Sequence, residues 1–161
     1  MTQLNEISDN AAHRTDEQFL QLALDQARAA AEAGEVPIGA VLVRGGIVIA
    51  SGQNRVIRDS DPTAHAEIVA LREAGRQLSN YRLTGCELFV TLEPCAMCAS
   101  AMTHARISRL IYAASDPKAG ADGSVLQVLN HPAGNHKIDV ARGLLAEEGS
   151  SLLRQFFAAR R

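Results

Sequence analysis

Residues 88–98 read LFVTLEPCAMC, and this stretch decides the fold. Its first part, Leu88–Leu92, is a near-continuous apolar run, which predicts a central strand covered on both faces. Pro94 predicts the start of a helix, because proline is favoured in a first helical turn. Further on, Ile107–Tyr112 predicts a second buried strand. A strand, a helix and a strand in this order imply a parallel pair joined by a right-handed crossover.

The flanking sequence completes one α/β domain. Thr15 and Gln18 form a capping-box pattern at the start of a helix. Gly45 and Gly46 separate two β-rich runs, 39–44 and 47–50, as in a hairpin with a tight turn. No repeat or linker interrupts the chain, so we expect a single domain over 15–161, after a disordered segment at 1–14. The other expected elements are helices near 63–78 and 147–161, a glycine-rich loop at 116–123 and a short helix near 125–129.

Composition excludes several classes of protein. No apolar run approaches 18 residues and the acidic N-terminus has no apolar core, so we expect neither a membrane partner nor a signal peptide. The three cysteines, two of them in a C-x-x-C, suit a reducing cytoplasm. The net charge of −2 does not by itself suggest a nucleic-acid partner. Residues 101–161 hold eight basic and five acidic residues, which fits either a phosphate-bearing partner or solvated surface.

Two short motifs carry the chemistry: His65-Ala-Glu67 and, about 30 residues later, Pro94-Cys95-Ala-Met-Cys98. Cys95 and Cys98 are three residues apart and share one helix face, in a first turn that lowers thiol pKa. With His65 they offer two sulfurs and one imidazole, the three-ligand set of a catalytic zinc site. His65 and Glu67 would lie roughly 200° apart on a straight helix. At a helix start, however, His65 can reach the metal while Glu67 reaches the metal-bound water.

A C-x-x-C alone has other interpretations. It could be a redox dithiol, or half of a structural zinc site with Cys86 as a further ligand. A redox dithiol needs no His-x-Glu, and Cys86 at the start of a strand is more typical of a small buried hydrophobe. His-x-Glu followed by Pro-Cys-x-x-Cys is the pattern of zinc nucleobase deaminases. Zinc lowers the pKa of bound water toward about 7. Glu67 can take that water's proton, deliver it to the ring nitrogen and, in a later step, protonate the departing ammonia.

From about Phe19 to Arg161 the sequence resembles the bacterial tRNA-specific adenosine deaminases, in the cytidine deaminase-like superfamily. The resemblance implies a cytidine deaminase-like three-layer α/β/α sandwich with a central mixed sheet, and a homodimer with one Zn²⁺ per subunit. It also implies conversion of the wobble adenosine, position 34 of tRNA-Arg, to inosine by zinc-hydroxide attack at C6 with release of ammonia. The substrate would be the anticodon stem-loop. The matching segments are EVPIGAVLV, GQNR, DPTAHAEI, NYRL, LFVTLEPCAMCASAM and ASDPKAGADGS.

The resemblance also assigns roles to single residues. His65, Cys95 and Cys98 match the zinc ligands, and Glu67 matches the proton shuttle. Substrate contacts are implied for Asn54, the backbone at Ala66, and Asp116 with Lys118; positions near the RNA are His104, Arg106, Phe156 and Phe157. Simpler interpretations stay open: Asn54 and Asp116 are also typical turn residues, and the two phenylalanines are also typical of a core. Ser115 and Pro117 depart from the family pattern.

Two other functions compete with this one. A zinc deaminase of a free base or nucleoside (guanine, cytosine or cytidine) would use the same zinc ligands and the same Glu67. An open rim with basic loops favours RNA, whereas a lid over the base favours a small metabolite. The third candidate is a non-catalytic, zinc-stabilised RNA-binding module. Glu67 argues against it, because a structural zinc site does not need an acid beside the metal.

Overall fold

The computed structural model describes residues 14–161 and contains one five-stranded mixed sheet in the order β2-β1-β3-β4-β5. β1 is antiparallel to β2 and β3, while β3, β4 and β5 are parallel. Apart from Arg14, the expected disordered segment 1–14 lies outside the described residues. The strands are β1 (Gly39–Arg44), β2 (Ile47–Gln53), β3 (Cys86–Leu92), β4 (Arg109–Ala114) and β5 (Asp139–Arg142).

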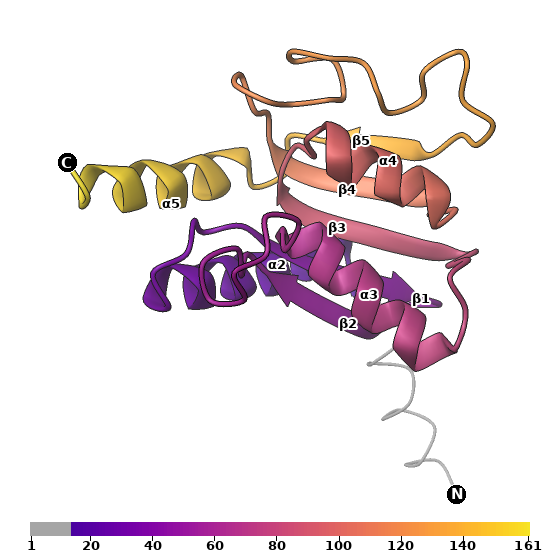
Figure 1. The fold of residues 1–161 in the computed structure, drawn as a ribbon, viewed down its shortest axis with the longest axis horizontal. Helices are drawn as coiled ribbons and strands as arrows, with labels where there is room; N and C mark the ends of the chain where they lie inside the picture. The colour runs from indigo at the N-terminus through magenta and orange to yellow at the C-terminus, as the bar shows by residue number, and fades with distance from the viewer. Residues whose placement is uncertain (1–13) are drawn as a thin grey trace, which may run out of the picture.

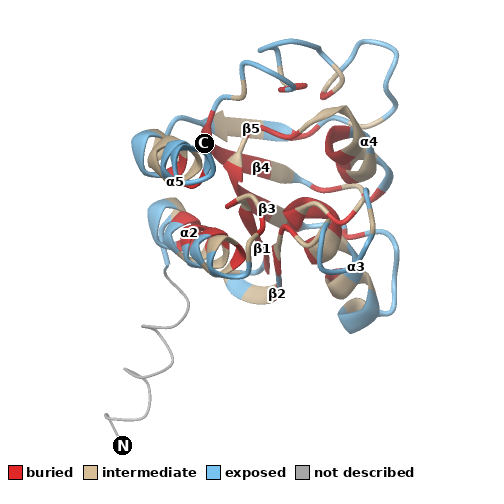
Figure 2. Cartoon of the chain, turned by 60° about the vertical axis from the view of Figure 1, so that its left-hand side comes forward, coloured by how far each residue is buried: buried red, intermediate tan, exposed pale blue. Residues whose placement is uncertain are grey.

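Helices cover both faces of the sheet (Figure 1). α3 (Ala66–Leu78) and α4 (Ala96–His104) lie on one face, and α2 (Asp16–Glu32) and α5 (Ala146–Ala158) lie on the other. Figure 2 shows the sheet between these two layers, with burial concentrated in the central strands β1, β3 and β4. The predicted three-layer α/β/α sandwich with a mixed central sheet is therefore confirmed. Within residues 14–161, no helix combines the length and the apolar character needed to cross a membrane.

Side chains along the central strands point alternately to the two faces of the sheet, so the core consists of two hydrophobic clusters. On β3, Leu88 and Val90 belong to the larger cluster, which includes residues of α3 and α4. Their neighbour Phe89 points to the opposite face and packs against Phe19 of α2, with ring centroids 5.0 Å apart. Because successive side chains of a strand point to opposite faces, a strand that is apolar at every position serves both layers. The near-continuous apolar run Leu88–Leu92 read from the sequence lies in this strand.

The local signals at the N-terminal side of the domain are confirmed. The Thr15 hydroxyl accepts a hydrogen bond from the Gln18 N–H, and the Gln18 side chain accepts one from the Thr15 N–H. Gly45 and Gly46 have φ values of 57° and 77°, which side chains with a Cβ rarely adopt. This is why a glycine pair can close the tight hairpin between β1 and β2.

Two expected elements differ in the structure, and one strand was not expected. The helix expected from 63 begins at Ala66, because Asp61 accepts hydrogen bonds from the N–H and hydroxyl of Thr63 and holds a turn there. The short helix expected at 125–129 is wrong: this segment forms turns and one isolated bridge. Its Val125 and Leu126 N–H groups bind the Gly120 carbonyl instead of forming helical bonds. β5 was not expected, since a four-residue edge strand has no readable apolar period.

Candidate active site

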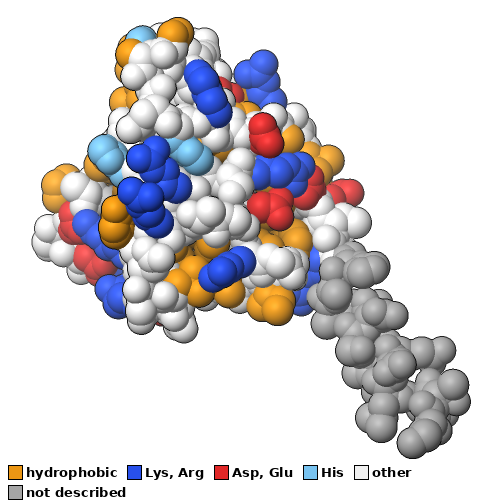
Figure 3. All heavy atoms as spheres, turned by 90° about the vertical axis from the view of Figure 1, so that its right-hand side faces the viewer, with side chains coloured by type: hydrophobic (Ala, Val, Ile, Leu, Met, Phe, Trp, Pro, Cys, Tyr) orange, Lys and Arg blue, Asp and Glu red, His pale blue; other side chains and the backbone are white. Residues whose placement is uncertain are grey.

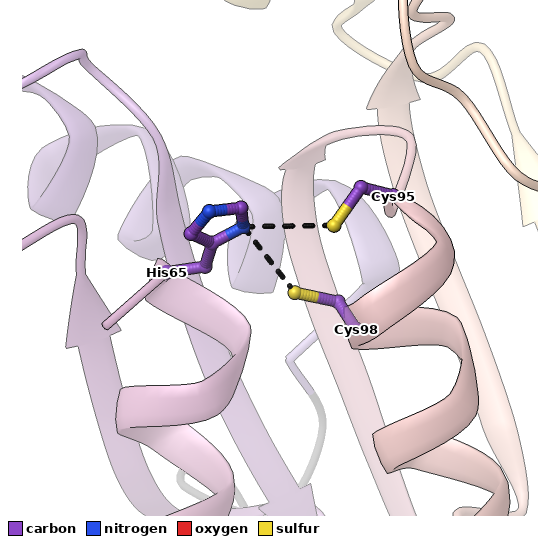
Figure 4. A group of neighbouring side chains, drawn as sticks. All are labelled: His65, Cys95 and Cys98. Atoms are coloured by element: carbon purple, nitrogen blue, oxygen red, sulfur yellow. Dashed lines mark hydrogen bonds between the residues drawn. The ribbon is translucent and has the colours of Figure 1, made fainter. Parts of the chain in front are cut away.

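Two helix starts bring the expected metal ligands together. His65 is the N-cap of α3 and Cys95 is the N-cap of α4, both in extended conformation, and Cys98 follows in the first turn of α4. His65 Nδ1 lies 3.6 Å from Cys95 Sγ and 3.5 Å from Cys98 Sγ (Figure 4). A tetrahedral zinc ion, with bonds of about 2.3 Å to sulfur and about 2.0 Å to nitrogen, sets such atoms about 3.5 Å apart. The three side chains therefore fit one zinc ion.

Cys86 takes no part in this group. The potential ligand atoms of the trio all lie within 4.8 Å of one another, and it is the only such cluster among residues 14–161. Cys86 is fully buried at the first position of β3 and packs in the core. The interpretation of Cys86 as a small buried hydrophobe is confirmed. Cys86 therefore does not supply the fourth protein ligand that a structural zinc site would need.

The surroundings of the trio favour a thiolate. A hydrogen bond from the Cys98 thiol, helped by His65, lowers the pKa of Cys95 to about 3. The same bond and burial raise the pKa of Cys98. The hydrogen bond with Cys95 also raises the pKa of His65. The site thus stabilises negative charge on sulfur, which is the form that binds a soft divalent metal.

Glu67 lies beside the trio but is not part of it. It follows His65 by two residues in the first turn of α3 and is 4% exposed. Burial raises the pKa of its carboxyl group, while a backbone N–H and the Cys98 thiol act in the opposite direction. A carboxyl group with a raised pKa can both take and return a proton near neutral pH. The arrangement is thus three soft ligands with one protonatable acid next to them.

Comparison with known proteins gives this arrangement a family. Residues 14–161 match the MafB19-like deaminase family. The chain is 51% identical over 143 residues to the tRNA-specific adenosine deaminase of Agrobacterium fabrum, covering 89% of this chain and 94% of that protein. It is 49% identical over 147 residues to the enzyme of the same name from Haemophilus influenzae, covering 91% and 85%. The chain belongs to the tRNA-specific adenosine deaminase family.

Solved structures agree on the fold and on deaminase chemistry. A structure from studies of A-to-I editing by tRNA:A34 deaminases has a TM-score of 0.82 at 50% identity, covering 84% of this chain and 98% of that one. A guanine deaminase from Nitrosomonas europaea has a TM-score of 0.78 at 28% identity, covering 91% and 87%. This member of the tRNA-specific adenosine deaminase family is therefore a hydrolytic deaminase, as the sequence predicted.

In the deaminase, the expected base contacts lie next to the ligands. Asn54 follows β2 and is 8% exposed, and its Oδ1 accepts a hydrogen bond from the Val56 N–H. The adjacent Arg55 N–H donates to the Ala64 carbonyl, one residue before His65. Ala66 is the first residue of α3, so its N–H belongs to the first helical turn, whose amides have no partner within the helix. Both expected contacts thus belong to the segments that converge at the start of α3.

The loop with Asp116 and Lys118 is held by a residue that sequence reasoning missed. Asp116 Oδ1 accepts hydrogen bonds from the Lys118 and Ala119 N–H groups, so its carboxylate shapes its own turn. The buried Glu93 accepts from the Asp116, Asp122 and Ser124 N–H groups. Burial alone would raise the Glu93 pKa, but the hydrogen bonds from Ser124, Asp122 and Asp116 outweigh it and keep the pKa below its usual range. The sequence signal that could have identified Glu93 was an acidic residue placed between a buried strand and Pro94.

A second missed acid organises the other loop at this end of the sheet. Glu35 is 1% exposed, and its Oε1 accepts hydrogen bonds from the Ile57 and Arg58 N–H groups at 2.9 and 2.8 Å. The Arg58 guanidinium also donates to the Asn54 carbonyl. Glu35 therefore anchors the charged loop that follows Asn54. Glu35 opens the matching segment EVPIGAVLV, but that segment does not reveal its role, because its partners are more than 20 residues away.

The remaining expected RNA contacts lie away from the trio. His104 ends α4, about 12 Å along the helix axis from Ala96. With Arg106 it lines a pocket of about 220 Å³, together with Tyr81, Arg82, Thr103 and Asn135. Phe156 and Phe157 lie on α5, on the other face of the sheet; Phe156 is buried and Phe157 is 46% exposed. A free base held at the trio would not extend to these residues, whereas a stem-loop is long enough.

Proposed function

We propose that this enzyme converts the wobble adenosine, position 34 of an arginine tRNA, to inosine. The placement of the buried Glu67 beside His65, Cys95 and Cys98 carries the deamination step. Because a free-base deaminase would share that placement, the choice of substrate rests on the relatives of this chain. The relatives from Agrobacterium fabrum and Haemophilus influenzae, both named tRNA-specific adenosine deaminase, support the same substrate class.

The protein's own residues account for most of the chemistry. His65, Cys95 and Cys98 would hold zinc, which when bound supplies hydroxide at neutral pH for attack at C6 of adenine. Glu67 takes one proton from the attacking water and delivers it to the ring nitrogen; it then takes the second proton from the same oxygen and delivers it to the departing amino group, which leaves as ammonia. The Ala66 N–H and Asn54 orient the base, so that C6 faces the attacking oxygen. Ammonia leaves and inosine remains.

An anticodon loop suits a deaminase that acts on a single extruded base. Its bases are already partly unpaired, so extruding one costs less than the few kcal/mol needed in a duplex. Asp116 and Lys118 would contact a neighbouring nucleotide. The pocket that contains Arg82, His104 and Arg106 offers positive charge for the RNA backbone. Figure 3 shows basic and histidine side chains gathered on the face that it draws.

A free-base deaminase is the second candidate, favoured by one observation. The guanine deaminase from Nitrosomonas europaea shares the fold at a TM-score of 0.78. Its identity to this chain is 28%, compared with 51% for the Agrobacterium fabrum relative. The higher identity over a similar share of the chain supports the tRNA substrate.

We also expect a homodimer acting in the cytoplasm, where tRNA is used. The mass of the purified protein, measured by light scattering, tests the dimer.

An inosine assay decides between the two substrates. The zinc-loaded protein is given an arginine-tRNA anticodon stem-loop and, in parallel, free adenosine, guanine and cytidine. Inosine at the wobble position only, absent with Glu67→Ala, is the expected result. Turnover of a free base with unchanged RNA would instead move the function to nucleobase metabolism. Zinc content of Glu67→Ala, measured alongside, shows that the variant has lost the acid and not the metal.

A further inference from the structure

Glu93 occupies the junction between the central strand and the metal-binding helix. It follows the last residue of β3 and precedes Pro94 and Cys95. Its backbone N–H donates to the Ala114 carbonyl at the end of β4, at 2.8 Å. Its side chain is 2% exposed, although it is charged. A buried carboxylate is costly unless hydrogen bonds compensate for the lost water, so its partners indicate what it does.

Among residues 14–161, all the hydrogen-bond partners of the Glu93 side chain come from one loop, 116–124. The Asp116, Asp122 and Ser124 N–H groups donate to it at 3.2, 2.9 and 3.3 Å, and the Ser124 hydroxyl donates as well. The loop makes one more bond to the same junction, from the Ala121 N–H to the Pro94 carbonyl at 2.8 Å. The loop therefore packs onto the two residues that directly precede Cys95.

Gly120 shows how closely the loop fits around this carboxylate. A Cβ at position 120 would lie 2.3 Å from Glu93 Oε2 and 2.6 Å from the Asp116 carbonyl oxygen. Such distances require the loop or the carboxylate to move. Glycine is thus needed here for close approach, and not for an unusual φ, since Gly120 is absent from the positive-φ glycines.

We propose that Glu93 is a positioning residue that fixes the 116–124 loop relative to Cys95 and Cys98. Because all four donors lie on the loop and the acceptor is two residues from Cys95, the loop cannot shift without breaking these bonds. The carboxylate thereby sets the distance between the metal ligands and the loop residues Asp116 and Lys118. This inference rests on the proposed function in one respect: it assigns Glu93 to substrate binding through the loop, and not to the chemical step.

The test compares Glu93→Gln with Gly120→Ala in the zinc-loaded, full-length protein. A glutamine side chain keeps the shape but loses the charge and turns an NH₂ group toward N–H donors. Gly120→Ala displaces the carboxylate without changing it. We expect each variant to raise KM for the anticodon stem-loop about tenfold, the size expected when a hydrogen bond to a charged group is lost. We expect kcat within about twofold of the parent and an unchanged zinc content.

Glu87→Gln is the matched control. Glu87 lies near the other end of β3 and pairs with Arg109, so the same chemical change there removes one charge without touching the loop. We expect its KM to equal that of the parent. Ser124→Ala, which removes a single donor at an exposed position, should raise KM by about two- to threefold. It keeps the proposal testable if Glu93→Gln does not fold.

Amide hydrogen exchange separates this inference from the proposed function. Exchange at residues 122 and 124 should be slow in the parent and faster in Glu93→Gln, whatever the substrate is. Unchanged exchange there, or a fall in kcat with KM unchanged, would overturn the role of Glu93. A parent enzyme that leaves the stem-loop unedited would overturn the proposed function instead, and the exchange result would still decide whether Glu93 anchors the loop.

Discussion

Gly52 of β2 and Ala66 of α3 approach each other so closely that no side chain fits between them. A Cβ on Gly52 would lie 2.3 Å from the Ala66 carbonyl oxygen and 2.7 Å from the Ala70 nitrogen. Ala66 directly follows the ligand His65 and directly precedes Glu67. The position of both functional side chains therefore depends on Gly52, which lies outside the two motifs that supply the metal ligands and the acid.

Gly52→Ala should both destabilise the protein and weaken zinc binding. Overpacking of this kind costs about 1–3 kcal/mol, and the shift of α3 moves His65 away from the two thiols. Thermal unfolding and zinc titration measure the two effects. Gly75→Ala is the control within α3, because its Cβ would meet nothing closer than 3.5 Å. Alanine favours a helix over glycine by about 1 kcal/mol, so the control should be as stable as the parent or more so; equal behaviour of both variants would contradict the close approach.

Glu67→Gln should abolish turnover without releasing the metal. The amide keeps the shape of the buried side chain but cannot transfer a proton, and general acid–base catalysis contributes about 10²–10⁴-fold. We expect kcat to fall by at least about a hundredfold, with the dissociation constant for the stem-loop nearly unchanged. Inosine formation and zinc content are measured on the same sample. Substantial activity in this variant would assign the proton to another group.

Cys98→Ser should remove zinc, whereas Cys86→Ala should not. A serine hydroxyl is a hard, weak ligand compared with a thiolate, so the first variant loses metal and activity together. Cys86 is buried in the core away from the ligand group, so its truncation lowers stability alone. In a further test, the activity of the chelator-treated parent enzyme should be restored by Zn²⁺ but not by Mg²⁺. Loss of zinc from Cys86→Ala would instead make Cys86 a fourth ligand, beside His65, Cys95 and Cys98.

Substrate binding should weaken as salt rises. Each phosphate contact contributes a slope of about −0.7 in log K against log salt for single-stranded RNA. Arg106→Gln should reduce the magnitude of this slope by about 0.7, the contribution of one contact, and leave kcat unchanged. Arg106 donates to Asn135 in the basic pocket, so Asn135→Ala serves as a control for loss of that contact alone. A salt-independent affinity would count against contact with the RNA backbone.

Asp16→Asn should lower stability near neutral pH and have little effect in acid. Asp16 pairs with Arg109, whose hydrogen bond holds the pKa of Asp16 below its usual value. A carboxyl group with a lowered folded-state pKa stabilises the fold above its unfolded pKa and loses this contribution as pH falls through the folded pKa. Because both partners are about one-third exposed, we expect a loss below about 1 kcal/mol at pH 7. Urea unfolding should show a smaller difference in unfolding free energy between the parent and Asp16→Asn at pH 3 than at pH 7. An equal difference at both pH values would exclude a stabilising contribution from the Asp16–Arg109 pair.

The sequence by itself determined the central strand, the first helix, the hairpin and the ligand set. These depend on local patterns: an apolar run at Leu88–Leu92, a capping box at Thr15, and glycines at a turn that requires positive φ. The ligand trio could be predicted from the sequence because the residue types, and the short spacing within each of the two motifs, limit which metal can bind. His65 and Cys95 both became N-caps, so each is held by the start of its own helix.

Only the tertiary structure decided how these parts are fixed in place. Glu35, Glu93 and Gly52 hold the loops and the helix start around the site, yet each acts on residues far along the chain. The same cause explains the absent helix at 125–129, whose backbone bonds go to Gly120 and Ala121. Burial of a charge and close approach of two backbones depend on which segments meet in space. A local pattern therefore names the chemistry, while long-range hydrogen bonds and packing set its geometry.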